Sequence, residues 1–540
     1  MLRKIALLLV SLMVFMSATA FADITPNGEF PIVDTPTEIT VWAPIPGGQT
    51  DYSNNGTTKY FEEKTGVHVN WIEVPNSEQD VLFNTSIGSG DYPDYYMKNI
   101  TQSSELLTYY NDGVIIPLND LIDKYSVYLK QLLEEDPSVR EAITAPDGNI
   151  YCFPVVNYIP CQNVDAKIYV YKEWLNKYME ETGMPKPNTT EGLENMLSYF
   201  RDNDMNGNGD ASDEIPLTGH YQYKNTGNAV FYIMNGFCYL PNDYLYLDDG
   251  GKATMDVKTD AFRDGLRYIH NLYSEGLIDE GMFVQTLTTF RSLTSSTKDK
   301  VIVGACAAPY PYRVLTMQPD VENSVQWKDY EVLDPIQRAD GTTIVAGIPT
   351  AKVSAFGMIT TSCKNPEVVM RWVDSIYSTE MREYFVYGGE EGTGWEWRDG
   401  VKSIAGGDRA VVSLLDASER YEIWLPDWVG SWITDEMYCN VAANSETDET
   451  PLRVADGAHY DKYLKDTGIP FIVWCDDEDT VTEFGELDAL FISYLDTAIS
   501  EFTLGVKDIN DDATWQEYLT TLDAMGYDHF CEVATRYYGK

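Results

Sequence analysis

A strand–helix–strand unit near the start of the chain is the feature that most constrains its fold. The segment "EITVWAP" predicts a short strand from Ile39 to Trp42, and "TTKYFEEKTG" predicts a helix that Gly66 stops. In "VHVNWIEV", apolar and polar residues then alternate from Val67 to Val74, as they do in a second strand. Because a helix between two strands normally makes a right-handed crossover, the sequence predicts a parallel α/β sheet.

Ligands of such sheets bind beyond the carboxyl ends of the strands. The loop after the first predicted strand contains Trp42 and Pro44 and is therefore a candidate pocket wall. A second candidate is "GSGDYPDYY", residues 88–96, in which Asp91 and Tyr92 follow two glycines. An ordinary turn that leads into another strand is the alternative for this second loop.

The pattern of strands and helices starts again near Asn163. The segment "AKIYVYKEWLNKYMEETG" predicts a strand that leads into a helix, and "PNTTEGLENMLSYFRDND" predicts a helix that Thr189 or Thr190 caps. The last helix is expected to begin with a capping box formed by Thr514 and Glu517. Two mixed α/β domains joined by crossovers fit this pattern, and no tandem repeat is evident.

The first 22 residues, "MLRKIALLLVSLMVFMSATAFA", predict a secretory signal. Two basic residues precede an apolar run from Ile5 to Met16, and Ala20-Phe21-Ala22 stands before Asp23. The run is short for a bilayer span, which disfavours an uncleaved anchor. We therefore expect cleavage after Ala22 and a secreted protein located outside the cell, at its surface or in a periplasm.

The composition argues against several classes of function. A formal charge of −47 repels phosphate backbones and anionic lipid, so we expect no nucleic-acid partner. The eight cysteines include no Cys-x-x-Cys, and their spacing leaves open whether any disulfide forms. The chain also contains no His-Glu-x-x-His, Gly-x-Ser-x-Gly or Walker motif, so common catalytic signatures are missing.

The segment "DNDMNGNGDASDEIPL", residues 202–217, is rich in oxygen-bearing side chains and glycine, a combination that suits a calcium loop. In one register Asp204 takes position 1, and in a shifted register Asp202 does so, with Asp213 at position 12. The candidate ligands of the first register are Asp204, Asn206, Asn208, the carbonyl of Asp210, and Asp213 or Glu214. An acidic, solvated loop without metal is the alternative, since the same residues favour turns. The predicted calcium is structural, because the loop lacks the paired helix-loop-helix partner of a calcium sensor.

Several stretches together resemble the extracellular solute-binding proteins of bacterial ABC importers, in the family 1 group of LipO-like and alginate-binding-protein-like members. The matching stretches are "ITVWAP", "GSGDYPDYY", "PLNDLIDKY", "AITAPDGNIYCFP", "YKEWLNK", "TGMPKPNTTEGL", "DMNGNGDASDEIPLTG", "YIHNLYSEGLID", "NPEVVMRWVDSIYS", "YGGEEGTGWEW" and "TWQEYLTTLDAMGYDHFCEVATRYY". They occur in family order over nearly all of the chain that follows the predicted signal.

The resemblance implies a type 2 periplasmic-binding fold, in which two α/β lobes joined by crossing hinge segments close on a ligand in the cleft between them. After an N-terminal lead at 23–37, the first lobe is expected at 38–162 and 341–387, and the second at 163–340 and 388–540. The resemblance also implies structural calcium in the second lobe, at Asp204, Asn206, Asn208, Asp210, Asp213 and Glu214.

Two features depart from the family pattern. The acidic loop has one more residue before "DEIPL" than is usual, which leaves open whether Asp213 or Glu214 ligates. Many relatives carry a lipidated cysteine at the cleavage site, whereas here Asp23 follows and the nearest cysteine is Cys152. How the protein is retained at the cell is therefore open.

A sugar-binding cleft needs aromatic faces that stack on rings and polar groups that bond hydroxyls. The chain has 12 Trp and 38 Tyr. The candidate ligand-binding residues in its loops are Trp42, Asp91, Tyr92, Tyr310, Tyr312, Glu391, Trp395, Trp397, Trp424 and Trp428. Aromatic residues also fill hydrophobic cores, which is the alternative at each of these positions.

The sequence thus predicts a monomeric, non-enzymatic binding protein that delivers an oligosaccharide or another polar solute to an ABC permease. A secreted glycoside hydrolase is the alternative, with Glu390 and Glu391, or Glu396 and Asp399, as its carboxylate pair. Neighbouring acidic residues are weak support for that alternative in a chain with 85 of them.

Overall fold

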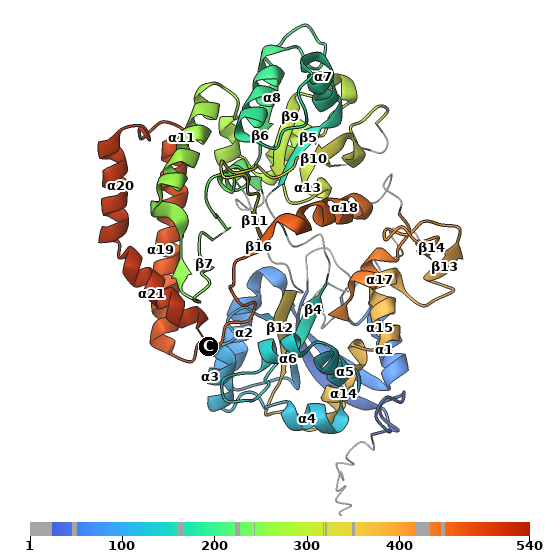
Figure 1. Cartoon of the computed structure of the whole chain (residues 1–540). Coiled ribbons are helices and arrows are strands. Elements are labelled where there is room, and N and C mark those ends of the chain that lie inside the picture. The colour runs from blue at the N-terminus through green and yellow to red at the C-terminus, as the bar shows by residue number, and fades with distance from the viewer. Residues whose placement is uncertain are drawn as a thin grey trace, which may run out of the picture.

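Two α/β lobes lie one above the other in the structure (Figure 1). The computed structural model describes residues 24–45, 51–158, 164, 167–221, 227–241, 243–316, 318, 321–347, 352–415, 419, 432–443 and 449–539. The predicted signal at 1–22 lies outside these ranges. Within them, no helix is both long and apolar enough to cross a bilayer.

The first lobe is built on a sheet that has six strands in the described part of the chain, in the order β15-β4-β12-β3-β1-β2. The strands are β1 (Thr37–Ile45), β2 (Val67–Pro75), β3 (Tyr95–Ile100), β4 (Phe153–Asn157), β12 (Lys352–Ile359) and β15 (Trp432–Ile433). The helices around this sheet are α1 (Gly56–Thr65), α2 (Gln79–Ser89), α3 (Glu105–Asn111), α4 (Asn119–Tyr125), α5 (Tyr128–Glu135), α6 (Pro137–Ile143), α14 (Pro366–Ile376) and α15 (Thr379–Glu383).

The predicted strand–helix–strand unit is confirmed. β1 pairs with β2 in parallel, with Thr37 opposite Val67, and α1 connects them and ends at Gly66. β1 also pairs in parallel with β3, whereas β12 runs antiparallel to β3 and β4. The carboxyl ends of β1, β2 and β3 therefore share one edge of this sheet.

A bulge in β12 lets the centre of this sheet pack tightly. The register of β12 against β3 shifts between Phe356 and Met358, and Gly357 between them has a φ of +61°. A Cβ at Gly357 would lie 1.8 Å from Oη of the buried Tyr95. Only glycine fits there, since it alone removes both the clash and the cost of positive φ.

The second lobe is built on a sheet that has four strands in the described part of the chain, in the order β10-β5-β9-β6. These strands are β5 (Lys167–Tyr171), β6 (Ile215–Thr218), β9 (Val303–Ala308) and β10 (Tyr330–Val332). The helices of this lobe are α7 (Lys172–Thr182), α8 (Thr190–Asp202), α10 (Ala229–Met234), α11 (Asp260–Ser274), α12 (Leu287–Thr294), α13 (Pro311–Val314), α18 (Thr450–Tyr460), α19 (Glu478–Thr503), α20 (Asp512–Ala524) and α21 (Tyr527–Tyr538). β6 and β9 are parallel, and β5 is antiparallel to β9 and β10.

The last helices of the chain, α19 to α21, stand beside α11 on one flank of the second lobe (Figure 1). The cap at the start of α20 differs from the prediction. The carboxylate of Asp511, rather than a Thr514 and Glu517 capping box, accepts the backbone N–H of Thr514 at 2.9 Å. The helix begins three residues earlier than predicted, because Asp511 lies at the extended position that an N-cap requires.

Two crossing segments pair with each other where the chain passes between the lobes. β11 (Val345–Gly347) lies parallel to β16 (Leu464–Asp466), with Val345 opposite Leu464. β11 leads into β12 of the first lobe, and the chain after β16 reaches the same lobe, where Trp474 Nε1 donates to the carbonyl of Ala142 at 2.8 Å. The pairing makes a narrow two-stranded link that suits a hinge.

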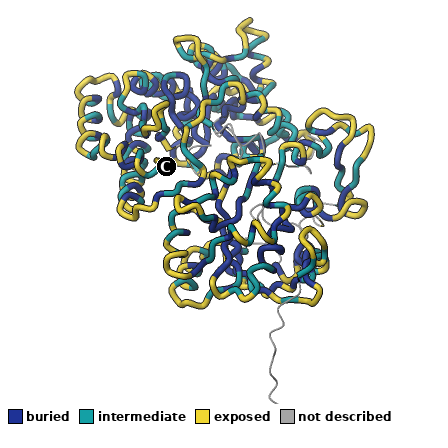
Figure 2. Tube along the Cα trace, turned by 60° about the horizontal axis from the view of Figure 1, so that its bottom comes forward, coloured by how far each residue is buried: buried dark blue, intermediate teal, exposed yellow. Residues whose placement is uncertain are grey.

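Each lobe has its own buried core (Figure 2). A third, small cluster of Tyr387, Trp395, Val411 and Met437 joins the hairpin of β13 (Trp395–Asp399) and β14 (Arg409–Ser413) to α17 (Asp435–Cys439). The expectation that all of 388–540 belongs to the second lobe needs a correction. β15 pairs with β4, so Trp432–Ile433 is part of the first sheet. This strand has only two residues, too few to show an alternating pattern in the sequence.

Candidate functional site

The acidic loop connects α8 to β6 and is organised around Asp204. Its Oδ1 accepts the backbone N–H of Gly207 at 2.7 Å and that of Asn208 at 3.1 Å, and its Oδ2 accepts that of Gly209 at 2.8 Å. Gly207 and Gly209 have φ values of +76° and +92°, which explains why glycine occupies both positions. Asp202, which starts the alternative register, instead pairs with Arg201 at 2.7 Å. The geometry therefore favours the register that starts at Asp204.

Successive side chains in this loop bond the backbone two residues ahead. Asn206 Oδ1 accepts the N–H of Asn208 at 3.0 Å, Asn208 Oδ1 accepts that of Asp210 at 2.7 Å, and Asp210 Oδ1 accepts that of Ser212 at 3.0 Å. The side-chain hydrogen bond from Ser212 is the main cause that lowers the pKa of Asp210. These turns hold the backbone of the loop in a compact form.

Two carboxylates close the loop. Asp213 accepts the amide N–H groups of Asn206 at 3.4 Å and Asn208 at 2.7 Å. Glu214 Oε1 accepts the backbone N–H of Met205 at 2.8 Å, while Glu214 Oε2 is buried without a hydrogen-bond partner. Burial is the main cause that raises the pKa of Glu214.

An orphaned buried carboxylate oxygen beside further oxygen donors fits a hard cation such as calcium. Among the described residues, no three His, Cys, Asp or Glu side chains form a metal cluster by themselves. Four of the six candidate ligands in the acidic loop are Asp or Glu, so no three of these carboxylates converge in this structure. The oxygens that they and the two asparagine amides offer are nevertheless of the kind that calcium prefers. The residues present therefore fit calcium in composition.

Two predicted tyrosines lie together in the second lobe. Tyr310 follows the carboxyl end of β9, and Tyr312 lies in α13, where its side chain is 46% exposed. α13 and α18 lie on the side of the second lobe that points toward the first lobe (Figure 1). This position, beyond the end of a strand that is parallel to its neighbour β6, is where open α/β sheets bind ligands.

Three arginines surround these tyrosines and were not singled out from the sequence. The guanidinium carbon of Arg453 lies 4.2 Å from the ring centre of Tyr310, and that of Arg291 lies 4.4 Å from the ring centre of Tyr312. Arg313 lies 5.8 Å from the ring centre of Tyr310 and 6.0 Å from that of Tyr312. The sequence offered one hint, since Arg313 belongs to the same "APYPYR" segment as both tyrosines. Arg291 and Arg453 are brought in by α12 and α18, which no local pattern could show.

The predicted residues of the "GGEEGTGWEW" segment lie in the β13–β14 hairpin region. Glu391 is exposed, and Trp395 is 2% exposed, with its Nε1 donating to the carbonyl of Gly389 at 2.9 Å. Trp397 is half-buried, and the guanidinium carbon of Arg409 lies 4.8 Å from its ring centre. Trp395 is therefore a core residue of the small third cluster, and Glu391 and Trp397 remain accessible.

The other predicted residues are separate from the tyrosines. Trp42 is 3% exposed, and its ring centre lies 5.8 Å from that of Phe83 in the first core, which does not support a role as a pocket wall. Tyr92 packs half-buried against the same core, and Asp91 is exposed. The predicted residues Trp424 and Trp428 lie outside the described residues.

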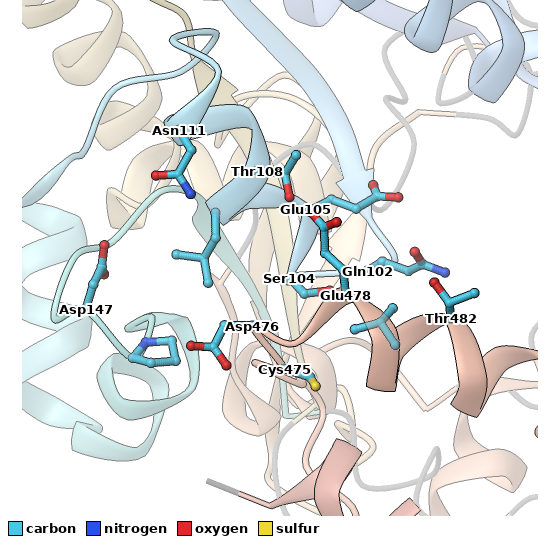
Figure 3. A pocket seen from close by; sticks show the side chains of 13 residues that line it. Gln102, Ser104, Glu105, Thr108, Asn111, Asp147, Cys475, Asp476, Glu478 and Thr482 are labelled. Carbon is cyan, nitrogen blue, oxygen red and sulfur yellow. The ribbon is translucent and has the colours of Figure 1, made fainter. Parts of the chain in front are cut away.

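A polar cavity of about 550 Å³ lies elsewhere, between α3 and the start of α19 (Figure 3). Glu105, Asp147, Asp476 and Glu478 bring carboxylates to it. None of the described residues that line this cavity is aromatic, so they offer no stacking face for a sugar.

Known proteins were compared with the whole chain. No protein-family profile matches it. The chain is 26% identical over 528 residues to the fructooligosaccharide ABC transporter substrate-binding protein FusA of Streptococcus pneumoniae, an alignment that covers 94% of this chain and 91% of FusA. It is 21% identical over 396 residues to lipoprotein LipO of Bacillus subtilis, covering 72% of this chain and 74% of LipO.

Solved structures agree with these relatives. FusA in complex with kestose superposes with a TM-score of 0.71 at 22% identity, covering 93% of this chain and 98% of that one. An extracellular solute-binding protein from Bifidobacterium longum subsp. infantis gives a TM-score of 0.74 at 18% identity, covering 93% of this chain and 98% of that one. This chain is an extracellular solute-binding protein of the ABC-importer type.

The identification confirms the α/β solute-binding fold that the resemblance implied. Alginate-binding protein AlgQ2 without calcium ion also superposes on this solute-binding protein, with a TM-score of 0.64 at 19% identity over 94% of this chain and 99% of that one. The expectation of a binding protein rather than an enzyme is confirmed by the same relatives. Of the two carboxylate pairs named for the hydrolase alternative, that of Glu396 and Asp399 is ion-paired in the β13–β14 hairpin, Glu396 with Arg398 at 2.5 Å and Asp399 with Arg409 at 3.4 Å.

Proposed function

We propose that this solute-binding protein captures an oligosaccharide between its two lobes and presents it, as an exported monomer, to the permease of an ABC importer. The observation that carries the proposal is the pair of Tyr310 and Tyr312, on the face of the second lobe that points toward the first. Aromatic rings stack on the apolar faces of sugars, and a half-exposed tyrosine also offers its hydroxyl. The names of relatives support the ligand class, since FusA is a fructooligosaccharide transporter protein and YtcQ of Bacillus subtilis a polygalacturonan/rhamnogalacturonan-binding protein.

Closure of the lobes is the proposed mechanism. A ligand that touches both lobes stabilises the closed form by its differential affinity, and the paired segments β11 and β16 are the proposed hinge. Among the predicted residues, Asp91, Tyr92, Glu391 and Trp397 are further candidate contacts, because the structure leaves each of them at least partly accessible.

Thermal unfolding tests the ligand class. The protein without its signal is heated with and without each member of a panel of oligosaccharides, including kestose, fructo-nystose and oligogalacturonates. A ligand that binds only the native state stabilises it by about 2.7 kcal/mol at one hundred times its Kd, so a true ligand raises the Tm. Substitution Tyr312→Ala should abolish most of that rise, and Tyr92→Ala should lower it if the candidate contact in the other lobe also touches the ligand. Release of shorter sugars from the panel, or no rise with any member, would contradict the proposal.

We also infer that the acidic loop holds one calcium ion through oxygens of Asp204, Asn206, Asn208, Asp210, Asp213 and Glu214. The buried and unpartnered Glu214 Oε2 supports this inference. The bound ion would neutralise the carboxylates that the loop holds together and so fix its shape. Among the relatives, a FusA EF-hand mutant has been solved in complex with fructo-nystose.

Thermal unfolding with and without added calcium tests the inference and the register of the loop. Calcium chloride should raise the Tm of the wild type, and Asp204→Asn should remove the rise by weakening the central ligand. Asp202→Asn is the matched control. Asp202 pairs with Arg201, so this substitution should leave the rise in Tm with calcium unchanged. Loss of the response in Asp202→Asn alone would favour the shifted register, and no response in the wild type would refute the site.

A further inference from the structure

The arginine–tyrosine cluster of Arg291, Arg313, Arg453, Tyr310 and Tyr312 carries an inference about the kind of sugar. We propose that the solute is an anionic oligosaccharide, whose carboxylate or sulfate groups the arginines of this cluster bind. The inference rests on the proposed function and deepens it, because it assigns a charge to the ligand.

The members of the cluster come from three elements. Arg291 lies in α12, Arg453 lies in α18, and the segment from Tyr310 to Arg313 contains both tyrosines and forms most of α13. The backbone N–H of Tyr312 donates to Glu449 Oε2 at 3.1 Å, and Glu449 Oε1 lies 3.7 Å from Arg453 Nη1. Glu449 thus ties the first turn of α18 to α13 and holds the cluster together.

The charge of the cluster differs from that of the protein as a whole. The chain has 38 basic and 85 acidic residues, yet three guanidinium groups gather around two rings here, and an ion pair with Arg453 places the carboxylate of Glu449 among them. A guanidinium fork matches the geometry of a carboxylate or sulfate, because it presents parallel N–H donors. Such a group counteracts the repulsion that an acidic protein exerts on an anionic ligand.

Among the three arginines of the cluster, Arg291 makes two contacts with Tyr312. One of its terminal nitrogens donates to the carbonyl of Tyr312, and its guanidinium lies over the ring of that residue. Its Nε is buried and has no hydrogen-bond partner in the structure. Because this nitrogen is buried and one terminal nitrogen already bonds a carbonyl, an anionic group can reach only the remaining N–H groups of the half-buried Arg291.

The arrangement also orders the rings for a sugar. An arginine stacked on one face of a tyrosine fixes the ring plane and leaves the edge or the other face for a ligand. One cluster can therefore stack on a pyranose ring and bond the carboxylate that a uronic acid carries on its sixth carbon. Asp456, one turn after Arg453 in α18, accepts a hydrogen bond from the hydroxyl of Tyr169 at 2.8 Å, which ties that carboxylate to β5.

Matched ligand pairs test the charge directly by calorimetry. Trigalacturonate and trimannuronate are each compared with their carboxyl-reduced neutral trimers, which keep the linkage and stereochemistry, and a sulfated trisaccharide separates sulfate from carboxylate. At least one anionic trimer should bind about 10- to 100-fold more tightly than its neutral counterpart, the range expected for hydrogen bonds to a charged group.

Substitutions assign the difference to the cluster. Arg291→Gln should remove most of the anionic preference, measured as the ratio of the affinities for the anionic and the neutral trimer, whereas Arg291→Lys should retain part of it, since it keeps charge without the fork. Arg267→Gln is the matched control, because Arg267 pairs with Asp264 in α11, outside the cluster. Circular dichroism shows whether each variant folds.

Three results would overturn the inference. If neutral trimers or kestose bind and no anionic sugar binds more tightly, the charge assignment fails while the oligosaccharide function stands. If no sugar of either kind binds, both fail together. An anionic preference that survives in Arg291→Gln and in Arg453→Gln would also exclude the cluster as its source.

Discussion

At the scale of single residues, a carboxylate in α14 of the first lobe is buried and depends on several hydrogen bonds to replace its contacts with water. Asp374 is 2% exposed, and it accepts hydrogen bonds from Ser126 Oγ at 2.6 Å and from the backbone N–H groups of Val127, Tyr128 and Leu129 at 2.9, 3.3 and 2.8 Å. It thereby satisfies the donors at the start of α5, where the helix dipole favours a negative charge.

Replacement of this carboxylate should be strongly destabilising. Asp374→Asn keeps one acceptor oxygen but turns an NH₂ group toward the remaining donors, so we expect a loss of about 2–3 kcal/mol in the free energy of unfolding. Urea denaturation measures it. Asp120→Asn in α4 is the control, because Asp120 is 86% exposed in an ion pair and should change stability by less than about 1 kcal/mol. Equal losses in the two variants would contradict the assignment.

The residue scale is also where sequence patterns were least reliable. An aromatic residue beside proline or glycine looks alike whether it faces a ligand or a core, and Trp42 and Trp395 proved to be buried. Tyr312 differs from them because its segment leaves the sheet edge, which only the three-dimensional course of β9 and α13 reveals.

At the scale of elements, the helices with strong local signals were predictable, and α8 offers a test of their caps. Both Thr189 and Thr190 were compatible with the sequence, and the structure selects Thr189, whose Oγ1 accepts the backbone N–H of Gly192 at 3.1 Å. Thr189→Ala should therefore cost about 1 kcal/mol, while Thr190→Ala, inside the first turn, should cost less than about 0.5 kcal/mol. Chemical denaturation of both variants decides it, and a larger loss in Thr190→Ala would refute the assigned cap.

Elements with weak local signals were not predictable. β15 has two residues and depends on β4 for its pairing, and the cap of α20 is an aspartate placed by the preceding loop. By contrast, β1, α1 and β2 combine periodicity with a glycine stop, so local and tertiary preferences agree there.

At the scale of the whole molecule, the division into two α/β lobes could be expected from the order of strands and helices, because each unit must bury its own apolar face. The way in which segments of the two lobes alternate along the chain could not be expected from that order. The chain enters and leaves the first lobe through segments far apart in sequence, and β11 pairs with β16 although more than 100 residues separate them.

This link predicts a change of shape when ligand binds. A sugar that contacts both lobes favours the closed form, so saturating oligosaccharide should lower the radius of gyration measured by X-ray scattering. A monosaccharide that binds one lobe alone has no differential affinity for closure and should leave the radius unchanged, which makes it the control. Calcium should also leave it unchanged, because the acidic loop lies between α8 and β6 of the second lobe alone. An unchanged radius at saturating oligosaccharide would mean that the two lobes do not close on their ligand, and the link of β11 and β16 would then be a rigid brace.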